Sequence, residues 1–272
     1  MISSRSRNLA TRPLAICVSI AAIALPQGAL AGAWTLGEGF GQVLVTGTAS
    51  EATQAFDSTR DRQGAPTYSK QELQALIEYG ATDWLTLMVQ PSLQHIAIAP
   101  PIDATRGGLG YTEFGARARL MQSGPWVASV QTTFRMPATT DSSNPAAIGY
   151  NDVEADVRGL VGYSFSLDGH PAFVDLQAAQ RFRGNGLPSE FRFDATLGIR
   201  LAPQWLLLLQ SLNTVSEGGG SLVTSYDYEK LQLSFVYDVS ARWSLQAGAF
   251  VTYSGRNALQ ENGGLLGAWY RF

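Results

Sequence analysis

Apolar and polar residues alternate one by one along most of this chain. Between Arg242 and Tyr253 the apolar positions recur at every second residue. Successive side chains of a β-strand point to opposite faces of a sheet, so this period of two predicts strands with one apolar and one polar face. The same reading predicts about twelve strands: Trp34–Thr48, Lys70–Tyr79, Trp84–His95, Thr112–Leu120, Trp126–Met136, Asp152–Phe165, Ala172–Arg183, Phe191–Leu201, Trp205–Leu212, Lys230–Val239, Arg242–Tyr253 and Leu265–Phe272.

Two of these segments do not show which face is which. The phase of the alternation changes within the glycine-rich segment Trp34–Thr48. Trp205–Leu212 is a nearly continuous run of leucine, so its inner and outer positions stay open.

The polar faces carry ionised side chains near the middle of strands, where a soluble sandwich would have no reason to place them. A transmembrane barrel explains both faces, because hydrocarbon lies outside and a polar lumen inside. The pattern therefore predicts an all-β fold, a transmembrane antiparallel β-barrel of about twelve strands. The lumenal candidates for solute selection are Glu113, Arg117, Arg119, Arg135, Glu154, Asp156, Arg158, Asp175, Arg181, Arg183, Asp194 and Arg200.

Connections of two lengths alternate between the predicted strands. Short turns are expected at Gly80–Asp83, Met121–Pro125, Leu167–His170, Ala202–Pro203 and Ser240–Ala241. Longer connections are expected at Ala49–Thr67, Ala97–Gly110, Pro137–Asn151, Glu217–Ser225 and Gly255–Asn262, while Gly184–Ser189 is short. Bacterial outer-membrane barrels have short periplasmic turns and long extracellular loops, so this rhythm predicts the bacterial outer membrane as the location.

The first 31 residues have the composition of a cleaved signal peptide. Arg5, Arg7 and Arg12 precede an apolar run from Leu14 to Leu25, and an Ala-Leu-Ala end follows at Ala31. The run is too short to span a bilayer as a helix. Residues 1–31 are therefore expected to be removed, together with the single Cys17, leaving residues 32–272 as one barrel domain without disulfides.

The last strand carries an outward apolar stripe of Leu266, Ala268, Tyr270 and Phe272, which ends in an aromatic residue. Such a terminal strand is what the barrel-assembly machinery recognises in outer-membrane proteins. The expected partners are therefore this machinery, outer-membrane lipids and lipopolysaccharide. The acidic balance, with 22 Asp and Glu against 19 Lys and Arg, argues against nucleic acid as a partner.

Two short motifs resemble a known family of barrels. The stretch from Glu78 to Leu87 resembles the "YG-x-T-D-x-L-x-L" hairpin of the outer-membrane transporter-like family named after the meta-pathway of phenol degradation. The stretch from Gly108 to Leu120 resembles that family's "GLGD-x-x-x-G-x-(K/R)-Y-x-L" strand, with Tyr111 in place of its frequent aspartate. The resemblance implies an outer-membrane protein that passes hydrophobic or aromatic compounds.

The lumenal charges are expected to face one another across hairpins. A tight turn at Leu167–His170 would place Asp156 opposite Arg181 and Glu154 opposite Arg183. Similarly, Glu113 would lie opposite Arg135, and Asp194 near Arg181 or Ala179. Opposed unlike charges stabilise adjacent strands. One interpretation is that these pairs fill the lumen and satisfy one another, and the other is a constriction that filters solutes by charge.

Aromatic side chains divide between the two predicted faces. Inward-pointing Trp84, Phe173, Phe250 and Trp269 either form a track for an apolar solute or pack near a barrel end. The outward-pointing aromatics are expected to form girdles at the membrane interfaces. They are Trp126, Phe134, Tyr163, Phe165, Phe191, Tyr237, Trp243, Tyr253, Tyr270 and Phe272.

The sequence offers little for catalysis or metal binding. A rim-located lipid hydrolase would need a histidine beside a serine, and only His95, with Ser69 as a neighbour, is a candidate, since His170 falls in a predicted turn. No Cys/His cluster has metal-ligand spacing. We therefore expect a channel or transporter-like barrel for small hydrophobic or aromatic molecules, with no enzyme activity, metal or cofactor. The alternatives are a rim hydrolase and a structural or adhesive barrel with a plugged lumen.

Overall fold

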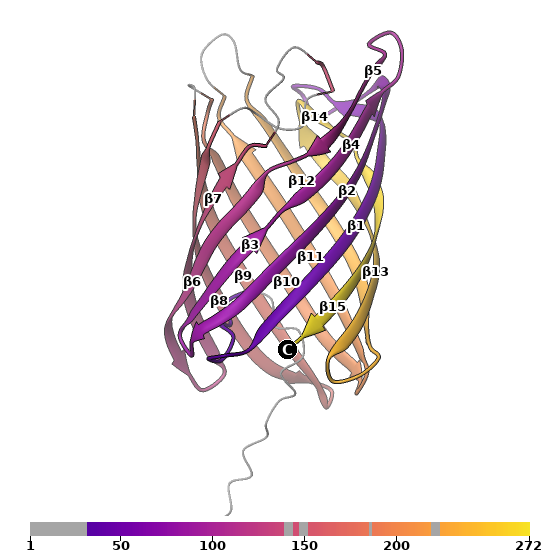
Figure 1. The fold of residues 1–272 in the computed structure, drawn as a ribbon. Helices are drawn as coiled ribbons and strands as arrows, with labels where there is room; N and C mark the ends of the chain where they lie inside the picture. The colour runs from indigo at the N-terminus through magenta and orange to yellow at the C-terminus, as the bar shows by residue number, and fades with distance from the viewer. Residues whose placement is uncertain (1–31, 139–143, 147–151, 185–186, 219–223) are drawn as a thin grey trace, which may run out of the picture.

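The computed structural model describes residues 32–138, 144–146, 152–184, 187–218 and 224–272. They form one closed antiparallel β-barrel of twelve wall strands (Figure 1). The predicted fold class is therefore confirmed. No helix in these ranges is long and apolar enough to cross a membrane.

Nine wall strands are single elements and three are broken in two. The single elements are β1 Gly41–Phe56, β2 Arg62–Thr82, β7 Trp126–Met136, β8 Glu154–Leu167, β9 His170–Arg183, β10 Glu190–Ala202, β11 Trp205–Ser216, β12 Tyr226–Asp238 and β13 Trp243–Arg256. The broken wall strands are β3 Leu85–Gln90 with β4 Ser92–Ile98, β5 Ala104–Leu109 with β6 Thr112–Ser123, and β14 Ala258–Leu259 with β15 Asn262–Arg271.

A proline causes the first of these breaks. Pro91 separates β3 from β4, and proline has no N–H to donate to a ladder. The neighbouring strand β2 passes the break without interruption, pairing with both pieces. The wall is therefore continuous although the strand is not.

The first and last strands close the barrel. Strand β1 pairs along its length with β15, from Gln42 opposite Arg271 to Glu51 opposite Asn262. The backbones of Gly41 and Phe272 then exchange two hydrogen bonds of 2.9 and 3.0 Å. Closure leaves no open sheet edge, which hydrocarbon would not tolerate.

All five predicted short turns are confirmed, and they lie at the end of the barrel that also holds the chain's C-terminus, the lower end in Figure 1. We call this the turn end and the opposite one the loop end. At the loop end three predicted loops are wrong in length. Strands β1 and β2 extend through most of Ala49–Thr67 and leave only residues 57–61 as their connection, because their register continues to Phe56 opposite Arg62.

The same extension shortens two further connections. Strands β4 and β5 pair within the predicted loop Ala97–Gly110, and β13 and β14 occupy much of Gly255–Asn262. The predicted loops Pro137–Asn151 and Glu217–Ser225 fall largely outside the described residues, and Gly184–Ser189 falls partly outside them.

The strand predicted at Trp34–Thr48 is wrong in its first part. The strand begins at Gly41, and the preceding residues 32–40 belong to no strand. Ala33 is fully buried and Trp34 is partly buried against inner-wall side chains. Residues 32–40, here called the N-terminal segment, therefore do not form the wall: residues 32–37 are buried or partly buried at the turn end of the barrel, and residues 38–40 are exposed at its mouth.

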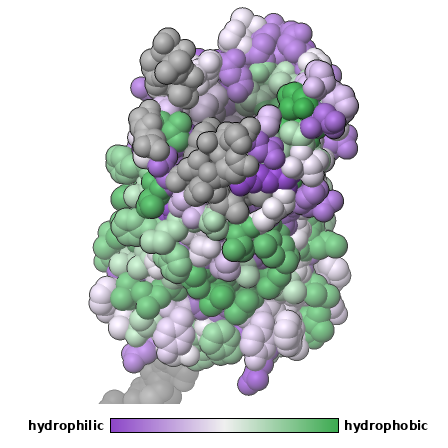
Figure 2. All heavy atoms as spheres, turned by 45° about the horizontal axis from the view of Figure 1, so that its top comes forward, coloured by the Kyte–Doolittle hydropathy of each residue, from purple (hydrophilic) through white to green (hydrophobic). Residues whose placement is uncertain are grey.

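The two faces of the wall differ as the alternation predicts. In a single-layered barrel, side chains that are buried must point inward. The outer face carries a band of exposed hydrophobic side chains, and hydrophilic side chains gather at the loop end (Figure 2). This arrangement fits a bilayer around the wall and water at the rim.

Candidate solute pathway

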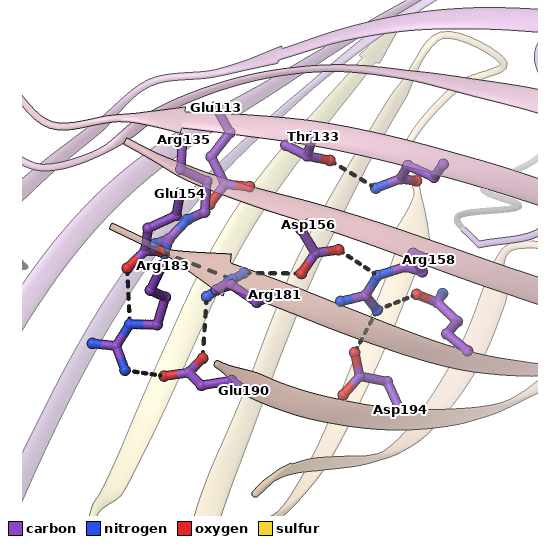
Figure 3. Close-up of polar contacts among 12 residues, drawn as sticks. Glu113, Thr133, Arg135, Glu154, Asp156, Arg158, Arg181, Arg183, Glu190 and Asp194 are labelled. Atoms are coloured by element: carbon purple, nitrogen blue, oxygen red, sulfur yellow. Dashed lines mark hydrogen bonds and ion pairs between the residues drawn. The ribbon is translucent and has the colours of Figure 1, made fainter. Parts of the chain in front are cut away.

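A network of ion pairs lines the inner wall of β6 to β10 in the half nearer the loop end (Figure 3). Near the loop end, Arg135 pairs with Glu113 at 2.7 Å and also with Glu154. Arg183 joins Glu154 to Glu190 through two pairs of 3.2 Å. We call this network, together with the pairs of Asp156 described next, the charge ladder.

The ladder continues toward the middle of the lumen. Arg181 lies 3.4 Å from Asp156, and Arg158 lies 3.5 Å from the same carboxylate. Arg158 also binds Asp194 at 2.6 Å and Gln177 at 2.6 Å. Each ion therefore bridges two or three strands of the wall.

The predicted pairings within hairpins are confirmed by the register. Asp156 lies opposite Arg181, Glu154 opposite Arg183, and Glu113 opposite Arg135. The predicted position of Asp194 near Arg181 or Ala179 is wrong. Asp194 lies opposite Gln177, because the connection between β9 and β10 is longer than a tight turn, and its carboxylate binds Arg158.

A second ion pair lies between the charge ladder and the turn end. Arg117 binds Glu78 at 3.0 Å, and both side chains are nearly inaccessible. Glu78 also accepts a hydrogen bond from Gln42 on β1. The sequence reasoning missed Glu78 because it treated this residue as part of a turn motif. The signal was present, since Glu72, Gln74 and Glu78 share one face of the strand.

The remaining predicted lumenal ions lie outside the charge ladder. At the turn end Arg200 binds Asp238 at 2.6 Å, and Arg271 lies 3.5 Å from the same acid. Arg119 is partly buried, and no ion pair involves it within the described ranges. Asp175 is almost fully buried and contacts the N-terminal segment. Glu190 and Asp238 were not predicted as lumenal ions, although Glu190 shares the polar face of its strand with Asp194.

An apolar cluster covers the inner wall toward the turn end. Phe173, Leu206, Leu208, Val236 and Trp269 are all buried and pack together. Leu44 and Trp34 pack against them, and the Trp34 ring meets the Phe173 ring edge-on at 5.5 Å. An apolar patch of this kind is unusual for the lumen of a barrel, which is generally polar.

The four aromatic residues predicted to point inward therefore lie in three different places and do not form one continuous track. Phe173 and Trp269 belong to the apolar cluster. Phe250 lies further toward the loop end, with the Lys230 ammonium 5.3 Å from its ring centre. Trp84 is wrongly predicted, since it lies in the turn between β2 and β3 with 54% of its surface exposed. The alternation of inward and outward side chains holds only within a strand, so it does not predict the direction of a side chain in a turn.

The outward aromatics gather in pairs near the turn end. Trp126 packs on Tyr163, and Trp243 packs on Tyr270, with ring centres 4.4 and 4.7 Å apart. Tyr237 packs in the same way on Trp205. Toward the loop end Phe134 lies opposite Phe114. These positions agree with girdles at two membrane interfaces.

The N-terminal segment lies beside both the apolar cluster and the ion pair of Arg117 with Glu78. The Trp34 carbonyl accepts a hydrogen bond of 3.0 Å from Arg117, and the Ala33 carbonyl accepts one from Ser129. Nearer the turn end, the Leu36 N–H donates to the Thr86 hydroxyl at 2.9 Å. The segment therefore places ordered backbone within the lumen, bound to side chains of the inner wall.

The predicted rim histidine and its candidate serine do not form a hydrogen-bonded pair in the described part of the chain. His95 lies exposed on β4, and the Ser69 hydroxyl makes no hydrogen bond to it among the described residues. His170 lies near the carbonyl oxygen of Arg200 at 3.2 Å in the turn-end hairpin. Over the described ranges, no group of three His, Cys, Asp or Glu residues is arranged to hold a metal ion.

Solved structures show which known folds this barrel shares. An outer membrane channel from Pseudomonas putida F1 superposes with a TM-score of 0.73, at 15% identity over 88% of this chain and 98% of that chain. The beta domain of the Bordetella autotransporter BrkA gives a TM-score of 0.54, at 13% identity over 86% of this chain and 100% of that one. The NanC porin gives 0.51, at 7% identity over 84% and 98%. No protein-family model and no curated protein matches this sequence. The fold is thus that of outer-membrane barrels.

Proposed function

We propose that this protein is an outer-membrane conduit for small hydrophobic or aromatic molecules. The observation that carries this proposal is the apolar cluster on the inner wall. A pathway for polar solutes gains nothing from Phe173, Leu206 and Trp269, whereas an apolar solute that displaces Trp34 from them is stabilised by the contact. The similarity of two motifs to the meta-pathway barrels points to the same class of solute.

The ion pairs support a lumen that does not select solutes by their charge. The acids and arginines of the charge ladder bind one another, so their charges are largely compensated and repel or attract a charged solute weakly. A neutral solute would pass such a wall with little electrostatic penalty. The ladder then acts as a rigid, neutral frame above the apolar cluster.

Uptake of an apolar fluorophore tests the proposal. Cells that produce the protein should take up N-phenylnaphthylamine several-fold faster than cells with an empty vector, and Trp269→Ala should reduce this rate. Trp205→Ala is the matched control, since Trp205 lies on the outer face. Uptake at the rate of the empty vector, with normal amounts of folded barrel, would refute a conduit for such solutes.

A structural barrel with a filled lumen is the second candidate. The observation that favours it is the N-terminal segment, which lies within the lumen beside an already paired set of ions. On this reading, Asp156→Asn lowers stability and leaves permeability unchanged. Planar-bilayer recordings of the purified protein separate the two, since a filled barrel conducts no ions.

A further inference from the structure

One buried carboxylate in the lumen has no cation. Asp175 is 1% exposed, and it is the one buried acid in the described residues that forms no ion pair. The others, Glu78, Glu154, Asp156, Asp194 and Asp227, each bind an arginine. A buried charge without a partner is strongly unfavourable.

The contacts that Asp175 does make come from neutral donors. The backbone N–H of Ala33 donates to Oδ1 at 2.9 Å, and the Gln177 amide donates to Oδ2 at 2.5 Å. The arginines that act on it from a distance, Arg117 and Arg158, are bound to other acids. The site therefore lacks one positive charge.

Gly32 lies directly against this carboxylate. A Cβ built on Gly32 would lie 2.4 Å from the carboxyl carbon, and the residue has a φ of +108°, so both space and backbone demand glycine. A backbone nitrogen lies roughly 2.5 Å from the Cβ position of its own residue. The Gly32 nitrogen is therefore within about 5 Å of the carboxylate, a short shift from ion-pair contact.

We propose that Asp175 is the binding site for the chain's own α-ammonium group, created by cleavage between Ala31 and Gly32. The proposal rests on the signal peptide predicted from the sequence. In the hydrolysis, water breaks the Ala31–Gly32 peptide bond, Ala31 leaves as a carboxylate, and Gly32 gains an amine that is protonated at neutral pH. Before cleavage the same nitrogen is an uncharged amide with a single hydrogen.

Cleavage thereby links processing to the position of the N-terminal segment. The part of the segment next to β1 is held at the turn end of the barrel. There the N–H of Glu38 donates to the Asp83 carboxylate, and the N–H of Gly39 donates to the Gly80 carbonyl. The ion pair with Asp175 would hold the other end of the segment, at Gly32, inside the lumen. Because the segment lies in the solute pathway, this bond would set how far the pathway is open.

Selective acylation of the α-amine tests the proposal on the full chain after export. The protein is purified from outer membranes in detergent, its N-terminus is identified by intact mass, and acylation by acetyl-N-hydroxysuccinimide ester is followed at neutral pH. In the folded wild type, the Gly32 amine should react at least about tenfold more slowly than in Asp175→Asn, since an ion pair protects it. Asparagine retains the shape of the site, so simple enclosure would protect both proteins equally.

Two further variants keep the test independent of folding. Asp238→Asn removes a lumenal acid that contacts arginines and not the segment, and its Gly32 amine should stay as protected as in the wild type. Two glutamines inserted after Ala31 leave the cleavage site in place, displace the ammonium from Asp175, and should expose it to reagent. A mature N-terminus other than Gly32 would overturn the proposal. So would equal acylation rates in the wild type and in Asp175→Asn or, if that variant does not fold, in the insertion variant.

Discussion

At the scale of single residues, buried ions hold neighbouring strands together from the inside. Arg117 is the central example, because it reaches Glu78, Gln131 and the Trp34 carbonyl from one guanidinium group. Its planar fork of donors suits this task, since several hydrogen bonds form with little loss of freedom. The pair with Glu78 joins β6 to β2 across the intervening strand β3.

Neutralising one member of this pair should cost much more than breaking a pair at the rim. We expect Glu78→Gln to lower the free energy of unfolding by about 3 kcal/mol, since it leaves the arginine buried and unpaired. Urea unfolding followed by tryptophan fluorescence would measure it. Arg60→Ala is the control. The Arg60 side chain is 48% exposed, and its partner Asp227 keeps Arg256, so we expect a loss of less than about 1 kcal/mol. Equal losses would mean that water in the lumen solvates Arg117.

At the scale of the element, β11 shows how neighbours decide the orientation of an apolar strand. Leu206 and Leu208 point inward and are 3% and 7% exposed, while Leu209 is 38% exposed on the outer face. Leucine suits both faces of this strand, because the inner wall here is apolar. The register against β10 and β12, which carry Asp194 and Ser234 inward, sets which leucines face the lumen.

An arginine introduced on the outer face of β11 should destabilise the barrel by an amount that depends on its depth in the bilayer. Leu209 lies near the middle of the strand and Val215 lies near the loop end. An arginine at the bilayer midplane costs about 2–4 kcal/mol, and one near the interface costs about 0–1 kcal/mol. Refolding of Leu209→Arg and Val215→Arg into lipid vesicles should show this order. The reverse order would place the bilayer elsewhere on the wall.

At the scale of the whole molecule, the lumen depends on a closed wall and on a segment that is not part of that wall. Closure between β1 and β15 places the start of the wall beside its end, both at the turn end. The residues immediately before β1 therefore lie at the mouth of the lumen. They enter it and meet Ser129, Asp175 and Arg117 from strands distant in the sequence.

Shortening this segment should open the lumen without unfolding the wall. Deletion of residues 33–39 removes Trp34 from the apolar cluster and leaves β1 intact. We expect a several-fold rise in single-channel conductance in planar bilayers. The shift of the folded barrel on an unboiled gel should be retained. An unchanged conductance in a folded barrel would show that the narrowest point lies elsewhere, for example at the charge ladder.

The amino-acid sequence by itself determined the period of the strands, their number and the end at which the tight turns lie. These are local properties, because alternation follows from the geometry of one strand and turns follow from a few residues. It also determined the pairs within tight hairpins, such as Asp156 with Arg181, since a two-residue turn fixes the register of its flanking strands.

Only the tertiary structure decided contacts that depend on the whole closed sheet. The pair of Arg117 with Glu78 spans an intervening strand, and that of Arg158 with Asp194 crosses a longer connection of unknown register. The inner face of β11 followed from its neighbours. The N-terminal segment changed from a predicted strand to a lumenal filling, because its hydrogen-bond partners Thr86, Arg117, Ser129 and Asp175 come from four other strands and become neighbours only when the barrel closes.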